Sequence, residues 1–185
     1  MTKQTRRIGA GIAVLITLVA GRPAAASDGR VVAAAAGTSM PRVRSSSPAI
    51  TVLMREAAAR SATFRGMVQT IDASDGIVYV EHGECRHGVR ACLAGVATAG
   101  SYRILHIKIH VGVKGQELMG SIAHELRHAV EVLGARSVTD STTMFLFYTR
   151  EGHRQGRVFE TDAAIAAGAT VRAEMRRSMR AAQGR

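Results

Sequence analysis

Residues 118–134 read LMGSIAHELRHAVEVLG, which is the pattern of an amphipathic helix. Apolar residues recur three and four positions apart, and this spacing places them on one helical face. They are Leu118, Met119, Ile122, Ala123, Val130, Val132 and Leu133. Gly134 follows the last of them, where glycine commonly ends a helix. The sequence therefore predicts one helix of about twenty residues.

This predicted helix contains an H-E-x-x-H motif, made by His124, Glu125 and His128. Two histidines four residues apart lie one turn apart on the same face, so both imidazoles can bind one metal ion. A carboxylate directly after the first histidine can take a proton from a water on that metal. The motif predicts a zinc site with Glu125 as general base. The alternative is a pair of solvated or core histidines without a metal.

A catalytic zinc site needs a third protein ligand, because zinc in such sites keeps its fourth position for water. Glu160 is the first candidate, since it is expected to open the last helix and to face the motif helix. Its alternative role is a carboxylate stabilised by the dipole of that helix. Glu131 lies about 10 Å along the axis from His124, so it is predicted to support the site rather than to bind the metal. The other candidates are His153, Glu151, Asp140 and Asp162.

Three strands are expected before the motif helix, at residues 77–81, 92–99 and 102–111. The first two are predicted to pair across the loop between them, which gives a small antiparallel sheet. In the third strand, every second residue from 103 is mostly apolar and is predicted to face the core. These residues are Arg103, Leu105, Ile107 and Ile109.

Further helices are predicted at residues 48–67, 141–150 and 160–179, with a glycine-containing loop through Gly152 and Gly156 before the last one. Helices packed on one face of a small antiparallel sheet make an α+β domain. The sequence therefore predicts one α+β domain over residues 48–185.

The N-terminal region is not expected to belong to this domain. Residues 1–26 have a basic start, an apolar run and a small-residue cleavage site, as in a secretory signal peptide. The adjacent basic residues Arg6 and Arg7 leave the general and the twin-arginine export routes open. Residues 27–47 are rich in Ala, Gly, Ser, Arg and Pro and predict a disordered linker. The protein is predicted to be exported, to the periplasm or outside the cell.

Cys85 and Cys92 are the only cysteines in the sequence. In an exported chain, an isolated pair on either side of a short loop that contains Gly88 predicts a disulfide. The alternative is that the cysteines bind a metal ion together with His82 or His87.

The formal net charge is +11, and several arginines lie in the predicted last helix, at Arg172, Arg176, Arg177 and Arg180. Such a basic stripe predicts weak association with an anionic envelope surface, with a solvated helix face as the alternative. The chain has no Trp and only 4% aromatic residues, so no specific nucleic-acid partner that relies on base stacking is expected.

His124, Glu125 and His128 on one helix, with Glu160 further along the chain, resemble the gluzincin group of zincin metallopeptidases. The resemblance covers roughly residues 100–175 and is most specific at the H-E-x-x-H motif. It implies that both histidines and Glu160 bind zinc and that Glu125 is the base. It also implies that a substrate peptide lies antiparallel to an edge strand, which the strand at 102–111 resembles.

Two features depart from the better-known gluzincins. Their third glutamate is usually followed four residues later by an aspartate that supports the first histidine, and the residue here is Ala164. The chain also lacks their large second domain, which predicts a shallow cleft. The candidates for a transition-state donor are Tyr148, His106, His110 and His153. The chain is also similar to small exported bacterial proteins with an A-H-E-L-x-H-A helix followed by F-E-T.

These features together predict an exported zinc metallohydrolase, and more narrowly a peptidase that acts on peptide or protein substrates. The alternative from another class is a non-catalytic zincin-like binding or structural module of the cell envelope. A third interpretation, a basic protein that binds the envelope, depends on charge alone.

Overall fold

The computed structural model describes residues 39–110, 112 and 115–184. The predicted signal peptide and most of the predicted linker lie outside these residues. The described part contains five α-helices, a short 3₁₀ turn, a four-stranded sheet and a two-stranded sheet. The fold is therefore α+β, as predicted.

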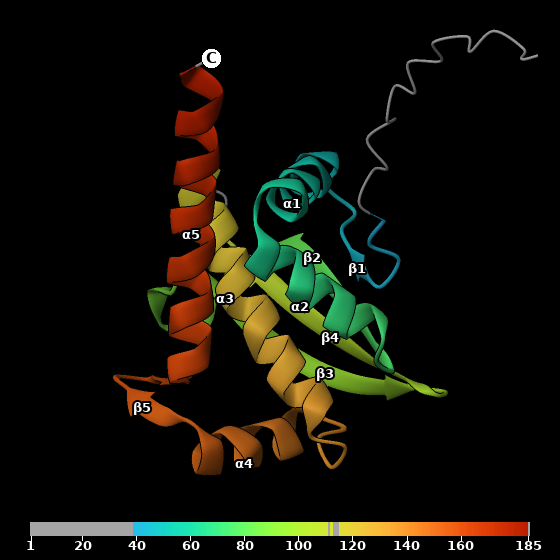
Figure 1. Cartoon of the computed structure of the whole chain (residues 1–185). Coiled ribbons are helices and arrows are strands. Elements are labelled where there is room, and N and C mark those ends of the chain that lie inside the picture. Colours follow the sequence, from blue (N-terminus) through green and yellow to red (C-terminus); the bar gives the residue numbers. More distant parts are fainter. Residues whose placement is uncertain (1–38, 111, 113–114, 185) are drawn as a thin grey trace, which may run out of the picture. The chain divides into compact units, whose positions relative to one another are not determined.

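The main sheet has the strand order β1-β2-β4-β3 (Figure 1). Its strands are β1 (Val43–Arg44), β2 (Gly76–His82), β3 (Ala91–Ala99) and β4 (Tyr102–Ile109). β4 pairs parallel with β2 and antiparallel with β3, so the sheet is mixed.

The prediction of an antiparallel sheet, with residues 92–99 paired to residues 77–81, is wrong. β3 and β4 instead form a hairpin with a two-residue loop, in which Gly100 has a φ of 61°. Such tight turns favour glycine at positive φ. Because β4 lies between β2 and β3, it is β3, and not β4, that forms an edge of the sheet, with β1 at the other edge.

One face of the sheet packs against helices and the other is open. In β4 the side chains of Arg103, Leu105, Ile107 and Ile109 are buried, as predicted, whereas those of His106 and Lys108 on the opposite face are exposed. The helices α2 (Ala62–Asp72) and α3 (Gly115–Gly134) cover the buried face (Figure 1).

The predicted single helix over residues 48–67 is two helices, α1 (Pro48–Arg60) and α2. Ser61 separates them in an extended conformation, with φ −118° and ψ 119°. Its hydroxyl accepts a hydrogen bond from the backbone N–H of Phe64 at 3.0 Å and donates one to Glu174 of the last helix. Ser61, which follows the last residue of α1, therefore caps the N-terminus of α2 with its side chain. Glu174, which is distant in the sequence, holds this side chain in place.

The C-terminal third contains α4 (Ser141–Glu151), α5 (Asp162–Gln183) and a hairpin of β5 (His153–Gln155) and β6 (Val158–Glu160). The hairpin replaces the predicted glycine-containing loop. Glu160 is the last residue of β6, so the prediction that it opens the last helix is wrong. The cap of α5 is instead Thr161, whose hydroxyl accepts from the backbone N–H of Ala164 at 3.1 Å.

Residues 39–47, predicted as the end of a disordered linker, belong to the fold. β1 pairs parallel with β2, and Val43 is buried in the core. This part of the linker prediction is wrong, because a two-residue strand is too short to produce a periodic sequence pattern.

Cys85 and Cys92 form a disulfide, as predicted, so they do not bind metal. The disulfide closes the loop between β2 and β3, which contains a 3₁₀ turn at Arg86–Gly88. Among the described residues, none of the helices combines the length and the apolar character needed to cross a membrane.

Arg103 is a buried arginine that binds the C-terminal end of α3. Only 4% of its surface is exposed. Its guanidinium donates to the carbonyl oxygens of Val132, Leu133, Ala135 and Val138 at 2.7–3.1 Å. It also forms a two-point contact with the carboxylate of Asp75, at 2.7 and 2.9 Å, and this contact holds the pKa of Asp75 below its usual value. The arginine therefore joins β4 to the end of the motif helix.

Candidate metal site

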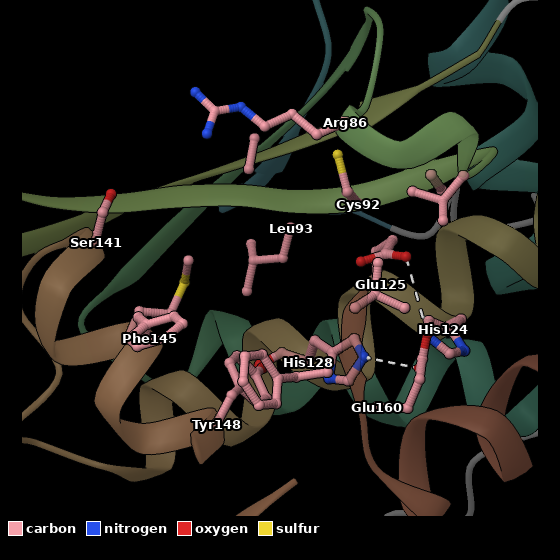
Figure 2. A pocket seen from close by; sticks show the side chains of 16 residues that line it. Arg86, Cys92, Leu93, His124, Glu125, His128, Ser141, Phe145, Tyr148 and Glu160 are labelled. Atoms are coloured by element: carbon pink, nitrogen blue, oxygen red, sulfur yellow. Dashed lines mark hydrogen bonds and ion pairs between the residues drawn. The ribbon is translucent and has the colours of Figure 1, made fainter. Parts of the chain in front are cut away.

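The side chains of His124, His128 and Glu160 converge on one point (Figure 2). One ligand atom from each lies within 4.8 Å of the others. Glu160 Oε2 is 2.8 Å from His124 Nε2 and 3.5 Å from His128 Nε2. The centres of the two imidazole rings lie 4.8 Å apart, and the ring planes form an angle of 79°. The sequence placed both histidines on one helical face, and Glu160 comes to them from β6.

The close packing of α3 against α5 brings Glu160 to the histidines. Gly168 of α5 lies so near α3 that a β-carbon there would be 2.9 Å from the carbonyl oxygen of Gly120 and 3.2 Å from the β-carbon of His124. A larger residue would push the helices apart. Two glycines therefore set the distance between the element with the histidines and the element that follows Glu160.

The three side chains fit a divalent metal ion. Glu160 Oε2 is buried and has no hydrogen bond of acceptable geometry among the described residues, although two imidazole nitrogens lie close to it. A buried carboxylate oxygen without a hydrogen bond is costly unless a cation compensates it. Two imidazole nitrogens and one carboxylate oxygen form the donor set of several catalytic zinc sites. The group can therefore hold a metal ion.

The same contacts determine the protonation of the metal-free site. Burial lowers the pKa of His128, but the hydrogen bond to Glu131 and the nearby carboxylate of Glu160 outweigh burial and raise it to about 9. Burial raises the pKa of Glu160, but the two neighbouring imidazoles lower it to about 2. At neutral pH the metal-free site thus holds a proton on His128 and a negative charge on Glu160. A metal ion has to displace this proton when it binds.

Glu131 supports His128 from its other ring nitrogen. Its Oε2 lies 3.0 Å from His128 Nδ1, and its Oε1 accepts from the Thr161 hydroxyl at 2.8 Å. An Nδ1–H that donates to a carboxylate leaves Nε2 free to bind a metal. Thr161 directly follows Glu160 in the chain. The Glu131 carboxylate therefore holds both His128 on α3 and the residue next to Glu160. The position expected for a supporting aspartate is the buried Ala164.

Replacing Glu131 by glutamine is expected to lower zinc affinity by about 10- to 100-fold, because the charged partner of His128 is lost. Chelator competition at fixed pH measures the change. Arg127→Gln is the matched control, since the Arg127 side chain contacts the same carboxylate at 3.4 Å from a partly exposed position and, in the described part of the chain, forms no hydrogen bond with either histidine. Equal losses of affinity in the two variants would contradict the role of Glu131.

Glu125 lies beside the group but does not belong to it. Its carboxylate is 4.0 Å from His124 Nε2, and only 6% of the residue is exposed. Burial raises its pKa, although the nearby histidines and the backbone of Leu93 oppose this effect. A buried carboxylate with a raised pKa, close to a metal position, is placed to accept a proton.

The site opens into a pocket of about 410 Å³ between β3, α4 and β6. β3 forms one wall. The resemblance placed the edge strand at 102–111, and this is wrong, because β4 is internal and β3 is the edge. The pairing of β3 with β4 shifts by one residue between Leu93 and Gly95, which is a β-bulge beside the site. Bulges of this kind often re-aim an edge strand next to functional sites.

Of the four donor candidates, only Tyr148 lines the pocket. Its hydroxyl donates to the carbonyl oxygen of His128 at 3.0 Å, and burial raises its pKa. His106 stacks on Tyr79 at the open face of the sheet. His110 lines a separate cavity with Arg90. The fourth candidate, His153, is exposed on β5.

The other candidate ligands do not join the group. Glu131 contacts His128 at Nδ1, and His153 lies 3.9 Å from Asp162. Asp140 is the N-cap of α4, where its side chain accepts from the backbone N–H of Thr143. Glu151, the last residue of α4, is exposed.

Comparisons of the chain with known protein families, with curated proteins and with solved structures find no match. The evidence for a function therefore comes from the site itself.

Proposed function

We propose that this protein is an exported, gluzincin-like zinc metallopeptidase that cleaves peptide bonds in peptide or protein substrates. One observation supports this proposal above all. The group of His124, His128 and Glu160 lies next to a buried carboxylate, that of Glu125, in a pocket at the edge of a sheet.

His124, His128 and Glu160 would hold the zinc ion. When bound, zinc would supply a Lewis acid that polarises a carbonyl group and lowers the pKa of a coordinated water. Glu131 would keep His128 in the tautomer that presents Nε2 to the ion. Zinc is favoured over magnesium or calcium because two of the three donors are imidazole nitrogens.

Glu125 would move the proton. Its carboxylate would accept a proton as the nucleophilic oxygen attacks the carbonyl carbon, and would then donate it to the leaving amine nitrogen. Glu125 and Leu93 of β3 line the same pocket, so the carboxylate lies next to the strand that would hold the substrate. Burial raises the pKa of Glu125, and this makes its carboxylate a stronger base for the first transfer.

β3 would align the substrate. As the edge strand of the sheet, it can pair with an extended peptide, and main-chain hydrogen bonds then hold the peptide without regard to its side chains. The pocket lies along this edge, so a paired peptide would pass the metal group. This arrangement supports a peptide substrate rather than a small compact molecule.

Export is supported by the disulfide, since such bonds persist in oxidising compartments. The basic residues of α5 include Arg176, Arg177 and Arg180, all exposed. They support weak association with an anionic envelope surface as a secondary part of the proposal.

The purified protein is expected to bind about one zinc ion per chain and to cleave an unfolded protein substrate only when zinc is bound. His128→Ala removes a ligand, so both the zinc content and the cleavage are expected to be lost. Elemental analysis and gel electrophoresis of the digest measure the two properties on one preparation. Equal zinc content in the wild-type and His128→Ala proteins would refute the metal site.

A non-catalytic zincin-like module is the second candidate, and one observation favours it. The Tyr148 hydroxyl is already bound to a backbone carbonyl, and the other three expected donors lie away from the pocket. This candidate predicts stoichiometric zinc and no hydrolysis.

A further inference from the structure

One side of the pocket is apolar and partly exposed. Met144 and Phe145 of α4 and Phe159 of β6 line it. Phe145 is 56% exposed, and its ring lies edge-on against Phe159 with the ring centres 5.5 Å apart. A large aromatic surface left open beside a pocket is suited to a bulky apolar side chain of a ligand.

Among the residues that the structure describes, Arg86 is the only lysine or arginine that lines the pocket. It is exposed, and among the described residues it has no ion pair or hydrogen bond. In Figure 2 the ribbon of β3 lies between Arg86 and the metal group. The disulfide ties Cys85, the residue before Arg86, to Cys92 of β3. The disulfide therefore fixes the backbone next to Arg86 relative to the edge strand, and the arginine side chain extends from this point with its charge unpaired among the described residues.

The two sides of the pocket correspond to the two faces of β3. Figure 2 shows Leu93 on the side of the metal group and Cys92 on the side of Arg86. An extended peptide that pairs with this edge alternates its side chains in the same way. If one side chain points toward Phe145, its neighbours in sequence point toward Arg86.

We propose that the site selects peptide segments in which a bulky apolar residue is adjacent to an acidic residue. The apolar side chain contacts Met144, Phe145 and Phe159, and the carboxylate pairs with Arg86. This inference rests on the proposed function, because it names the substrate class of the same site. Because Arg86 is exposed, its ion pair with the acidic residue of the peptide is screened by salt. We therefore expect this pair to contribute selectivity mainly at low salt.

The test uses the zinc-loaded Glu125→Gln protein and labelled octapeptides of alanine and glycine that contain one phenylalanine. The residue next to phenylalanine, on either side, is glutamate, glutamine or lysine. We expect the glutamate peptides to bind at least about fivefold more tightly than the lysine peptides at low salt. Fluorescence anisotropy measures the affinities. Arg86→Glu in the same background is expected to reverse the preference, and Phe145→Ala to weaken all the peptides.

Arg90→Glu is the matched control, because Arg90 belongs to the same loop but lines a different cavity. It should leave the preference for glutamate intact. The same preference in the Arg86→Glu and Arg90→Glu proteins, or no binding of any peptide, would overturn the inference. Cleavage is scored separately with wild-type protein. Selective binding without cleavage would refute the peptidase proposal and support the inference.

Discussion

Replacing Glu125 by glutamine is expected to lower peptide hydrolysis by about 10²- to 10⁴-fold and to leave zinc affinity unchanged. An amide of the same shape cannot accept the proton, so the chemical step loses its base. The carboxylate is not one of the three converging ligands, so the metal remains bound. The measurement is the rate of peptide hydrolysis together with zinc affinity from chelator competition.

Glu160→Gln makes the same chemical change at a proposed zinc ligand, and it should impair zinc binding rather than proton transfer. The amide is a weaker ligand and the site loses its negative charge, so zinc affinity itself should fall. At saturating zinc, part of the activity should return in Glu160→Gln and none in Glu125→Gln. Normal zinc affinity in Glu160→Gln would exclude Glu160 as a ligand.

Replacing Arg103 by methionine is expected to lower the free energy of unfolding by about 3–5 kcal/mol. Methionine fills much of the space, but four carbonyl oxygens at and beyond the end of α3 lose the guanidinium donor. Those of Val132 and Ala135 keep a backbone N–H donor, whereas among the described residues those of Leu133 and Val138 have no other one. Buried carbonyls without partners are the main cost. Chemical denaturation followed by circular dichroism measures the change.

Asp75→Asn is the control for the charge pair alone. The Asp75 side chain is 48% exposed, so its pairing with Arg103 contributes little in water. Because the pairing lowers the pKa of Asp75, this small contribution is present above the usual pKa of an aspartate and is lost as pH falls. Equal destabilisation by Asp75→Asn and Arg103→Met would show that the carbonyl contacts have no role.

The sequence predicts the parts of the fold that depend on local periodicity. The apolar spacing of residues 118–134 predicts α3, and the alternation in residues 102–111 predicts the buried face of β4. The disulfide follows from the presence of just two cysteines near one loop. Strand pairing is different, because the chain from β2 to β4 passes through β3, and no local pattern shows that β2 and β4 are neighbours.

In the candidate site, too, some contacts follow from local sequence spacing and others depend on how distant elements pack. The spacing of His124 and His128 requires only a helix, so their proximity is predictable. The approach of Glu160 depends on contacts between distant elements, above all the pair Gly120 and Gly168, which permits close helix packing. These glycines lie inside helices, and a glycine within a helical pattern does not by itself identify its neighbour. The hydrogen bond from Thr161 to Glu131 is equally invisible in the sequence.

The separation of the ligands along the chain gives a bound ion a mechanical effect. His128 and Glu160 enclose the last turns of α3, α4 and the β5–β6 hairpin. Beyond α3, in residues 135–159, only Val138 and Tyr148 are buried. An ion that joins α3 to β6 closes the loop as a cross-link does, and so reduces the freedom of a segment with little core of its own. Loss of the ion would therefore loosen the wall that contains Phe145 before it affects the sheet.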